Sequence, residues 1–159
     1  MSASAREMIG SMEVRIAPCA RTERPRLYEL ARAAFDDRPE WDALGVLDVL
    51  SRDRVFVALR GGRPAGYLAL SRAEDGSVVV DQLLVAGGHE RRGIGRRLLE
   101  YAEGYALLAQ ARALRILVEE DNLPARDFYG RCGFRSVQPE VVELALPQRS
   151  RPGGAPWLS

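Results

Sequence analysis

One short stretch of the chain combines glycines and arginines in a spacing that suits phosphate binding. It runs from residue 90 to 97, reads ERRGIGRR, and is followed by apolar residues at helical spacing. The first N–H groups of a helix have no partner inside it, and the helix dipole favours an anion there. Glycine lets a ligand approach the backbone, and guanidinium groups suit phosphate oxygens. The stretch therefore predicts an anion site, most simply for a pyrophosphate. Its glycines are Gly93 and Gly95, and its arginines are Arg91, Arg92, Arg96 and Arg97.

The same stretch also fits a plain turn followed by a solvated basic helix face, because short glycine motifs are weak signals. Two specific nucleotide-binding motifs are excluded. A dinucleotide fingerprint needs a third glycine where Leu98 stands. A P-loop needs a lysine, and all 23 basic residues of this chain are arginine.

The elements around this stretch predict a single mixed α/β domain, with a central mixed sheet flanked by helices. The expected order is β-α-α-β-β-β-α-β-α-β-β. The strand at 77–85 carries few charges, which predicts a central position, and it should run parallel to the next strand. We expect strands at 13–18, 54–60, 65–71, 77–85, 114–120, 134–137 and 140–146, and helices at 21–35, 41–50, from the glycines to about 111, and 123–133.

The bulk composition of the 159 residues is that of an ordinary globular domain: 47% hydrophobic, 28% charged and a net charge of +1. This balance predicts neither a nucleic-acid nor a membrane partner. Two cysteines and the lack of a signal-like apolar start favour a reducing, cytoplasmic location. We expect a flexible leader over 1–12, one folded domain over 13–146, and a flexible tail rich in proline and glycine over 147–159.

A second motif, NLPARDFYGRCGF, spans residues 122–134. Together the two blocks resemble the GNAT superfamily of acyl-CoA-dependent N-acetyltransferases. That family carries Arg/Gln-x-x-Gly-x-Gly/Ala after its fourth strand and Asn-x-x-Ala-x-x-Phe-Tyr-x-x-x-Gly-Phe after its fifth. The chain departs at Glu90, where the family has Gln or Arg. The resemblance covers residues 13–146, and its matching positions are Gly93, Gly95, Asn122, Ala125, Phe128, Tyr129, Gly133 and Phe134.

The resemblance implies acetyl-CoA as co-substrate, no metal, and a set of binding residues. Backbone groups of Leu83, Leu84 and Val85 would bind the pantetheine arm. The loop from Glu90 to Arg96, which includes Ile94, would hold the pyrophosphate through its N–H groups. Asn122 would bond the cofactor arm, with Phe128 beside it. Tyr129 would protonate the leaving thiolate, a transfer that its chemistry permits when the two groups are aligned. The other interpretation of Tyr129 is a packed core aromatic.

An attacking amine must also lose a proton, because a primary amine is protonated at pH 7. Asp81 is the first candidate base, since it interrupts the apolar strand VVVDQLLV and stands where the family often has an acid. It is equally compatible with a solvated or arginine-paired residue. Glu119 and Glu120 are second choices. His89 is expected at the surface, and Cys132 is given no covalent role.

The acceptor is expected to be an amine of a small molecule or a peptide, carrying positive charge. Four acids, Asp36, Asp37, Glu40 and Asp42, stand beside Phe35 and Trp41 in FDDRPEWD, a mixture that suits a cation. The alternative is a solvated loop with two core anchors.

The sequence thus predicts an N-acetyltransferase that works by direct transfer in a ternary complex. Two alternatives stay open: an acyl-CoA-binding regulatory module without turnover, and a transferase for a different acyl-CoA. A homodimer is also possible through the last strands and the tail.

Overall fold

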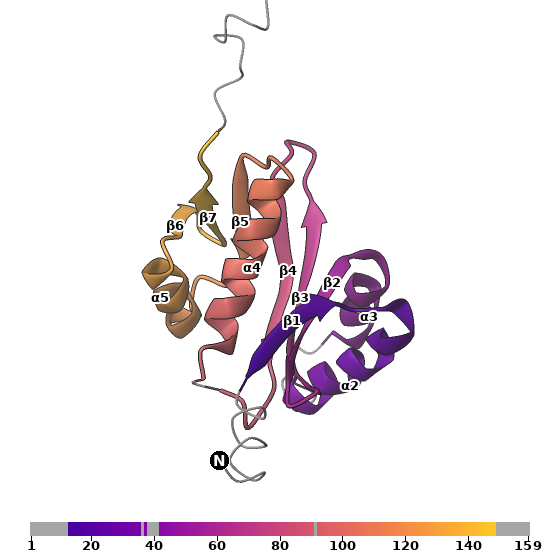
Figure 1. Ribbon diagram of the computed structural model, residues 1–159. Helices are drawn as coiled ribbons and strands as arrows, with labels where there is room; N and C mark the ends of the chain where they lie inside the picture. Colours follow the sequence, from indigo (N-terminus) through magenta and orange to yellow (C-terminus); the bar gives the residue numbers. More distant parts are fainter. Residues whose placement is uncertain (1–12, 36, 38–41, 91, 149–159) are drawn as a thin grey trace, which may run out of the picture.

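The fold is that of a computed structural model, which describes residues 13–35, 37, 42–90 and 92–148 (Figure 1). Its elements follow the predicted order, with one added 3-10 turn. The strands are β1 (Val14–Pro18), β2 (Arg54–Arg60), β3 (Arg63–Arg72), β4 (Val78–Val85), β5 (Ala113–Leu117), β6 (Arg135–Gln138) and β7 (Val141–Ala145). The helices are η1 (Arg21–Glu23), α2 (Arg24–Phe35), α3 (Ala43–Arg52), α4 (Ile94–Leu108) and α5 (Leu123–Arg131).

The strands of the described residues form one seven-stranded sheet in the order β1-β2-β3-β4-β5-β7-β6. Among the described strands only the β4–β5 pair is parallel, as the strand-helix-strand unit predicts, and β4 lies in the middle of the sheet. The predicted mixed α/β class is therefore confirmed. The leader at 1–12 and most of the tail lie outside the described residues, so the predicted domain limits stay predictions.

Two apolar cores cover the two faces of the sheet. On one face, Leu98 and Ala102 of α4 pack against Leu68, Leu70 and Leu114. On the other face, Leu27 of α2 and Leu50 of α3 pack against Val55, Val57 and Tyr67. Figure 1 shows the same arrangement, with α4 running along β4 and β5 on one face and α2 and α3 beside β2 and β3. None of the described helices is both long and apolar enough to cross a bilayer.

Several predicted boundaries were wrong by a few residues. The strand expected at 114–120 ends at Leu117, because the chain turns there and the N–H of Asn122 donates to the carbonyl of Glu119 at 3.1 Å. The helix expected to reach 111 ends at Leu108, and Gln110 then adopts a φ of 58°. The helix expected from residue 21 begins with the separate turn η1. These are errors at element ends, where local turns override the apolar pattern.

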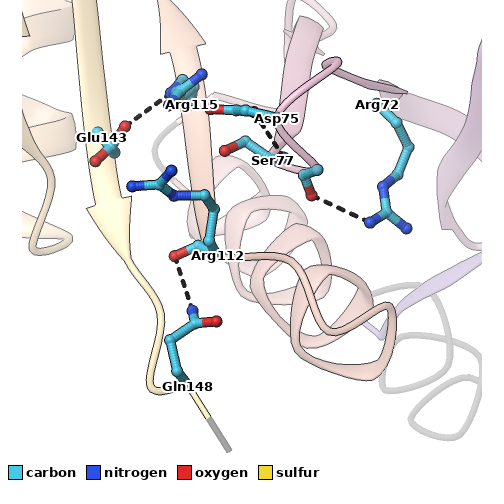
Figure 2. Close-up of polar contacts among 8 residues, drawn as sticks. Arg72, Asp75, Ser77, Arg112, Arg115, Glu143 and Gln148 are labelled. Carbon is cyan, nitrogen blue, oxygen red and sulfur yellow. Dashed lines mark hydrogen bonds and ion pairs between the residues drawn. The ribbon is translucent and has the colours of Figure 1, made fainter.

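The β4–β5 pair is closed at one end only. Val78, Val79 and Val80 pair with Leu114, Arg115 and Ile116 of β5. Gln82–Val85 pair with β3 alone, and Asp81 pairs with neither strand. We call the first part the closed end and residues 81–85 the open end. At the closed end, Arg115 donates to Asp75 of the β3–β4 turn at 2.6 Å and to Glu143 of β7 at 2.7 Å (Figure 2). These bonds tie the turn, β5 and β7 together.

Candidate active site

A bulge in β4 marks the start of the open end. Ala69 of β3 pairs with Gln82 and Leu70 pairs with Val80, so Asp81 is an extra residue without a partner on β3. Such a bulge bends its strand and redirects the side chains around it. The strand therefore diverges from β5 at the residue that the sequence singled out as a candidate base.

Gly66 supports this distortion from the neighbouring strand. It pairs with Val85, and a Cβ at this position would lie 2.4 Å from the carbonyl oxygen of Leu84. No side chain fits at that distance, so β4 can approach β3 this closely only because residue 66 is glycine. The backbone of the open end is thus fixed by an unusual contact on its β3 side and is left unpaired on its β5 side.

A cavity of about 490 Å³ occupies the space where β4 and β5 diverge. Its walls come from the end of α2, one side of α3 up to Val49, Tyr67 of β3, residues 80–84 of β4, the end of β5 and Tyr129 of α5. It brings together four predicted site residues, Asp81, Leu83, Leu84 and Tyr129. These residues are far apart in sequence, so the cavity is a product of the fold.

Tyr129 reaches the cavity from α5. Its ring packs against Phe128, with centroids 5.5 Å apart, and against Phe134, with centroids 6.0 Å apart. Burial raises the pKa of its phenol, so the group keeps its proton across the physiological range. Tyr129 therefore packs against aromatic neighbours and also lines the cavity, and its catalytic role stays a prediction.

The predicted anion site lies beyond the last residue of β4, at the start of α4. Gly93 is the residue before the helix and has a φ of 75°, which glycine adopts easily. The first hydrogen bond of the helix runs from the N–H of Arg97 to the carbonyl of Gly93, at 3.1 Å. The N–H groups of the residues just before Arg97 therefore have no acceptor within the helix. Ile94 is buried in the core, so it offers the site only its backbone. This geometry suits an anion at the helix start.

Gly95 links this helix start to the other predicted residues. A Cβ on Gly95 would lie 3.6 Å from the ring of Phe128 and 3.7 Å from a methyl group of Val85. The first turn of α4, the end of β4 and the second motif in α5 therefore meet at one point. The cavity and the helix start are connected through β4, which runs from one to the other.

The arginines of the first motif do not all face an anion. The guanidinium of Arg97 donates to the carbonyl of Val14 in β1 at 2.5 Å, which fixes the helix to the sheet edge. Arg92, Arg96 and Glu90 are exposed. Arg91 lies outside the described residues. His89, expected at the surface, is half-buried, and its Nδ1 lies 3.4 Å from the guanidinium of Arg60.

Asn122 has a structural task at the start of α5. Its side-chain oxygen accepts a hydrogen bond from the N–H of Ala125 at 3.3 Å, so it caps the helix. Its amide N–H groups remain the donors for the contact with the cofactor arm that the resemblance implies. The sequence interpretation missed the cap, although Asn followed by Pro124 is a recognisable helix start.

Asp81 lines the cavity with part of its side chain and is half-buried. Its Oδ2 atom is buried and accepts no hydrogen bond from a donor in the described part of the chain. The carboxyl group of Asp53, which follows α3, lies within hydrogen-bonding reach of it. The sequence analysis missed Asp53, and nothing in the local pattern marks it. Glu119 and Glu120, the second choices for a base, are exposed and are not among the residues that line the cavity.

The wall nearest α2 and α3 is acidic and aromatic. Phe35 and Asp42 line the cavity, and Asp42 also caps α3 by accepting from the N–H of Gly45 at 3.0 Å. Asp42 and Asp81 are the only charged residues among the described residues that line the cavity. Of the other predicted acids, Asp37 is exposed and does not line the cavity, and Asp36, Glu40 and the aromatic Trp41 lie outside the described residues.

Comparison with known proteins identifies the class. The pattern of the acetyltransferase (GNAT) family matches residues 20–134, and the chain belongs to this family. It is 37% identical to streptothricin acetyltransferase of Streptomyces lavendulae over 83 residues. This aligned segment covers 51% of this chain and 44% of that protein. It is 28% identical to streptothricin acetyltransferase of Escherichia coli over 69 residues, a segment that covers 43% of this chain and 40% of that protein. The matches thus span less than half of these relatives.

The fold comparison agrees with the family. A GNAT acetyltransferase from Brucella melitensis, solved in complex with acetyl-CoA, superposes with a TM-score of 0.68 at 21% identity. The superposition covers 86% of this chain and 93% of that protein. At this identity the likeness shows the fold alone.

Proposed function

We propose that the protein transfers an acetyl group from acetyl-CoA to the amine of a small molecule or peptide, by direct transfer in a ternary complex. One observation carries the proposal: a single cavity at the open end of β4 holds both Tyr129 and Asp81. The two groups have opposite tasks in such a transfer. One gives a proton to the departing sulfur, and the other takes a proton from the attacking nitrogen.

The donor side of the cavity suits a CoA thioester. The backbone of Leu83, Leu84 and Val85 is not paired with β5, so it can bond an extended pantetheine arm as an added strand would. The N-terminus of α4 is placed for the pyrophosphate, with Arg92 and Arg96 exposed nearby. Acetyl-CoA supplies the activated acetyl group. Tyr129, which burial keeps protonated, is the group that donates to the sulfur.

The acceptor side suits a cationic amine. Two charged residues stand among the described residues that line the cavity, and both are acids, Asp42 and Asp81. The aromatic rings of Phe35 and Tyr67 line the same cavity. Streptothricin acetyltransferases are among the relatives, which supports a small-molecule acceptor. Asp81 is the group that takes the proton from the arriving ammonium.

Calorimetry and turnover together test this proposal. Wild type and Tyr129→Phe are titrated with acetyl-CoA, and thiol release is then followed over a panel of amines and diamines. We expect both proteins to bind acetyl-CoA and only the wild type to turn over at a normal rate. Tyr101→Phe is the matched control, because Tyr101 packs on Phe56 with centroids 4.8 Å apart and is not a cavity residue.

The outcomes separate the alternatives. Binding by the wild type without turnover of any amine would favour the regulatory module. Turnover with propionyl- or succinyl-CoA that exceeds turnover with acetyl-CoA would favour a different acyl donor. No binding of any acyl-CoA would overturn the proposal as a whole.

A further inference from the structure

We propose that one proton, carried by Asp53, joins Asp53 to Asp81 behind the wall of the cavity, and that Asp53 is the positioning residue that holds Asp81 toward the acceptor amine. The inference rests on the proposed function and deepens it. Asp53 stands outside both sequence motifs, in the junction between α3 and β2. Its side chain is 1% exposed, so it is a buried acid that the motifs leave unexplained.

The contacts of Asp53 leave one oxygen without a donor. Its backbone N–H ends α3 by donating to Val49 at 3.0 Å, and its Oδ1 accepts from the guanidinium of Arg52 at 3.0 Å. Its Oδ2 is buried and accepts from no donor among the described residues. The Oδ2 atom of Asp81 is likewise buried and accepts from no donor among the described residues. Two buried oxygens without donors, on carboxyl groups within bonding reach of each other, are both satisfied when one group carries a proton.

The charges around the pair also favour that proton. Three acids lie close together here: Asp48, Asp53 and Asp81. Among the described residues, one guanidinium bonds to this group. It is that of Arg52, which donates to Asp48 at 2.9 Å and to Asp53. Arg54 and Arg72 line a hollow beside Asp53, and neither donates to its carboxyl. Burial, followed by the bond and charge of Asp81, raises the pKa of Asp53 to about 8, against the opposing effect of Arg52.

A protonated Asp53 gives Asp81 a fixed orientation. The Asp53 hydroxyl donates to Asp81 Oδ2, and Asp81 stays a carboxylate whose Oδ1 is left for the cavity. The acceptor ammonium gives one proton to Asp81, and the nitrogen lone pair then forms the N–C bond as the C–S bond breaks. Tyr129 gives its proton to the sulfur and regains one from the amide nitrogen through solvent. Asp53 keeps its own proton throughout.

The shared proton is tested first without turnover. Carbon-13 spectra of protein labelled at the aspartate carboxyl carbons are followed from pH 4 to 10 in wild type, Asp53→Asn and Asp81→Asn. We expect one wild-type carboxyl to titrate well above the ordinary value of about 3.9. That signal should vanish in Asp53→Asn and should titrate lower in Asp81→Asn. If both carboxyls of the wild type titrate in the ordinary range, the shared proton is disproved.

The positioning role is tested by the pH profile of kcat/KM for the best amine. Asn keeps the bond from Arg52 and donates an N–H to Asp81, so Asp53→Asn should stay within about threefold of wild type at pH 7. Asp53→Ala should lose about tenfold or more, within the range of one acid–base group. Above about pH 8 the wild type should decline as Asp53 ionises, and Asp53→Asn should not.

Two results would overturn the positioning role, and a third separates it from the proposed function. An unchanged profile in Asp53→Asn, or full activity in a folded Asp53→Ala, would give Asp53 a purely structural task. Bound acetyl-CoA in each variant, measured by calorimetry, shows that the fold is kept. A wild type that turns over no amine would refute the proposed function and this catalytic role with it, while the carboxyl spectra alone decide the shared proton.

Discussion

The two ends of the β4–β5 pair share the same strands but are held by different forces. At the closed end, three residues of each strand pair in register, and Arg115 ties the turn before β4 to β5 and β7 (Figure 2). At the open end, the bulge at Asp81 turns β4 away, and a cavity replaces the missing pairing. Backbone groups that would otherwise bond a neighbouring strand are left available there.

This difference explains how one sheet serves both stability and chemistry. The closed end keeps β4 and β5 together, so the open end can diverge without loss of the sheet. The open end concentrates what a fold normally avoids: a backbone contact that permits only glycine, strand residues unpaired on one side, and buried carboxyl oxygens without a donor among the described residues. Changes at the open end should therefore affect binding and turnover, and changes at the closed end should affect stability alone.

The largest effect is expected at the bulge. Asp81→Asn keeps the size of the side chain and removes its basicity, so kcat/KM for the amine should fall by about 10²- to 10⁴-fold. The affinity for acetyl-CoA, measured by calorimetry, should stay unchanged. Glu119→Gln and Glu120→Gln are the matched controls, because both acids are exposed after β5. A similar loss in either control, or an active Asp81→Asn, would assign the base elsewhere.

The next effect is expected on the β3 side of the open end. Gly66→Ala places a Cβ 2.4 Å from the Leu84 carbonyl, so β4 must shift at the residues proposed to bind the pantetheine arm. We expect the free energy of unfolding to fall by about 1–3 kcal/mol, with weaker binding of acetyl-CoA.

The control for this change is another glycine with free space. Gly104 lies within α4, and a Cβ there meets nothing within 4 Å. Gly104→Ala should raise the free energy of unfolding by about 0.5–1 kcal/mol and leave binding unchanged. Urea unfolding and calorimetry measure both variants. Equal behaviour of the two would show that the close contact at Gly66 does not fix β4.

The same comparison shows what the sequence could and could not predict. The helix start at Gly93 and the second motif could be predicted because they are local features. The spacing of residues along the chain determines which of their groups come together. The apolar pattern of VVVDQLLV also predicted a central strand, and Asp81 was noticed because it breaks that pattern. These features depend on neighbours in sequence, and the structure confirms the fold they predict.

Asp53 was missed for the opposite reason. It follows α3 in the segment SRDRVF, where an acid looks like an ordinary turn residue. Its burial and its contact with Asp81 arise only when β2, β3 and β4 align in register, with one extra residue in β4. The bulge itself is also invisible in the sequence. A site that depends on long-range register needs a structure to be found.

A smaller effect is expected at the start of α4. Gly93 has a φ of 75°, so Gly93→Ala should cost about 1–2 kcal/mol in the free energy of unfolding and weaken binding of acetyl-CoA at the helix start. Gly88→Ala is the matched control, since Gly88 has a φ of 86° and equal free space but lies five residues before Gly93, away from the helix start. It should cost similar stability with less effect on binding. Equal loss of affinity in both would argue against an anion site at Gly93.

The smallest effect is expected at the closed end. The N–H of Ser77 and then the guanidinium of Arg115 lower the pKa of Asp75 to about 2. Because this folded-state pKa is below the unfolded value of about 3.9, the carboxylate contributes stability above pH 4 and loses it as the pH falls toward 2. Asp75→Asn should therefore be slightly less stable than wild type at pH 7, and this difference in stability should shrink between pH 4 and 2.

Urea unfolding measures this difference. The control is Asp127→Asn, which removes an exposed ion pair with Arg131. Turnover should be unchanged in Asp75→Asn, because the closed end holds the strands together and takes no part in the transfer. A loss of activity in Asp75→Asn at full stability would show that the two ends are not separate.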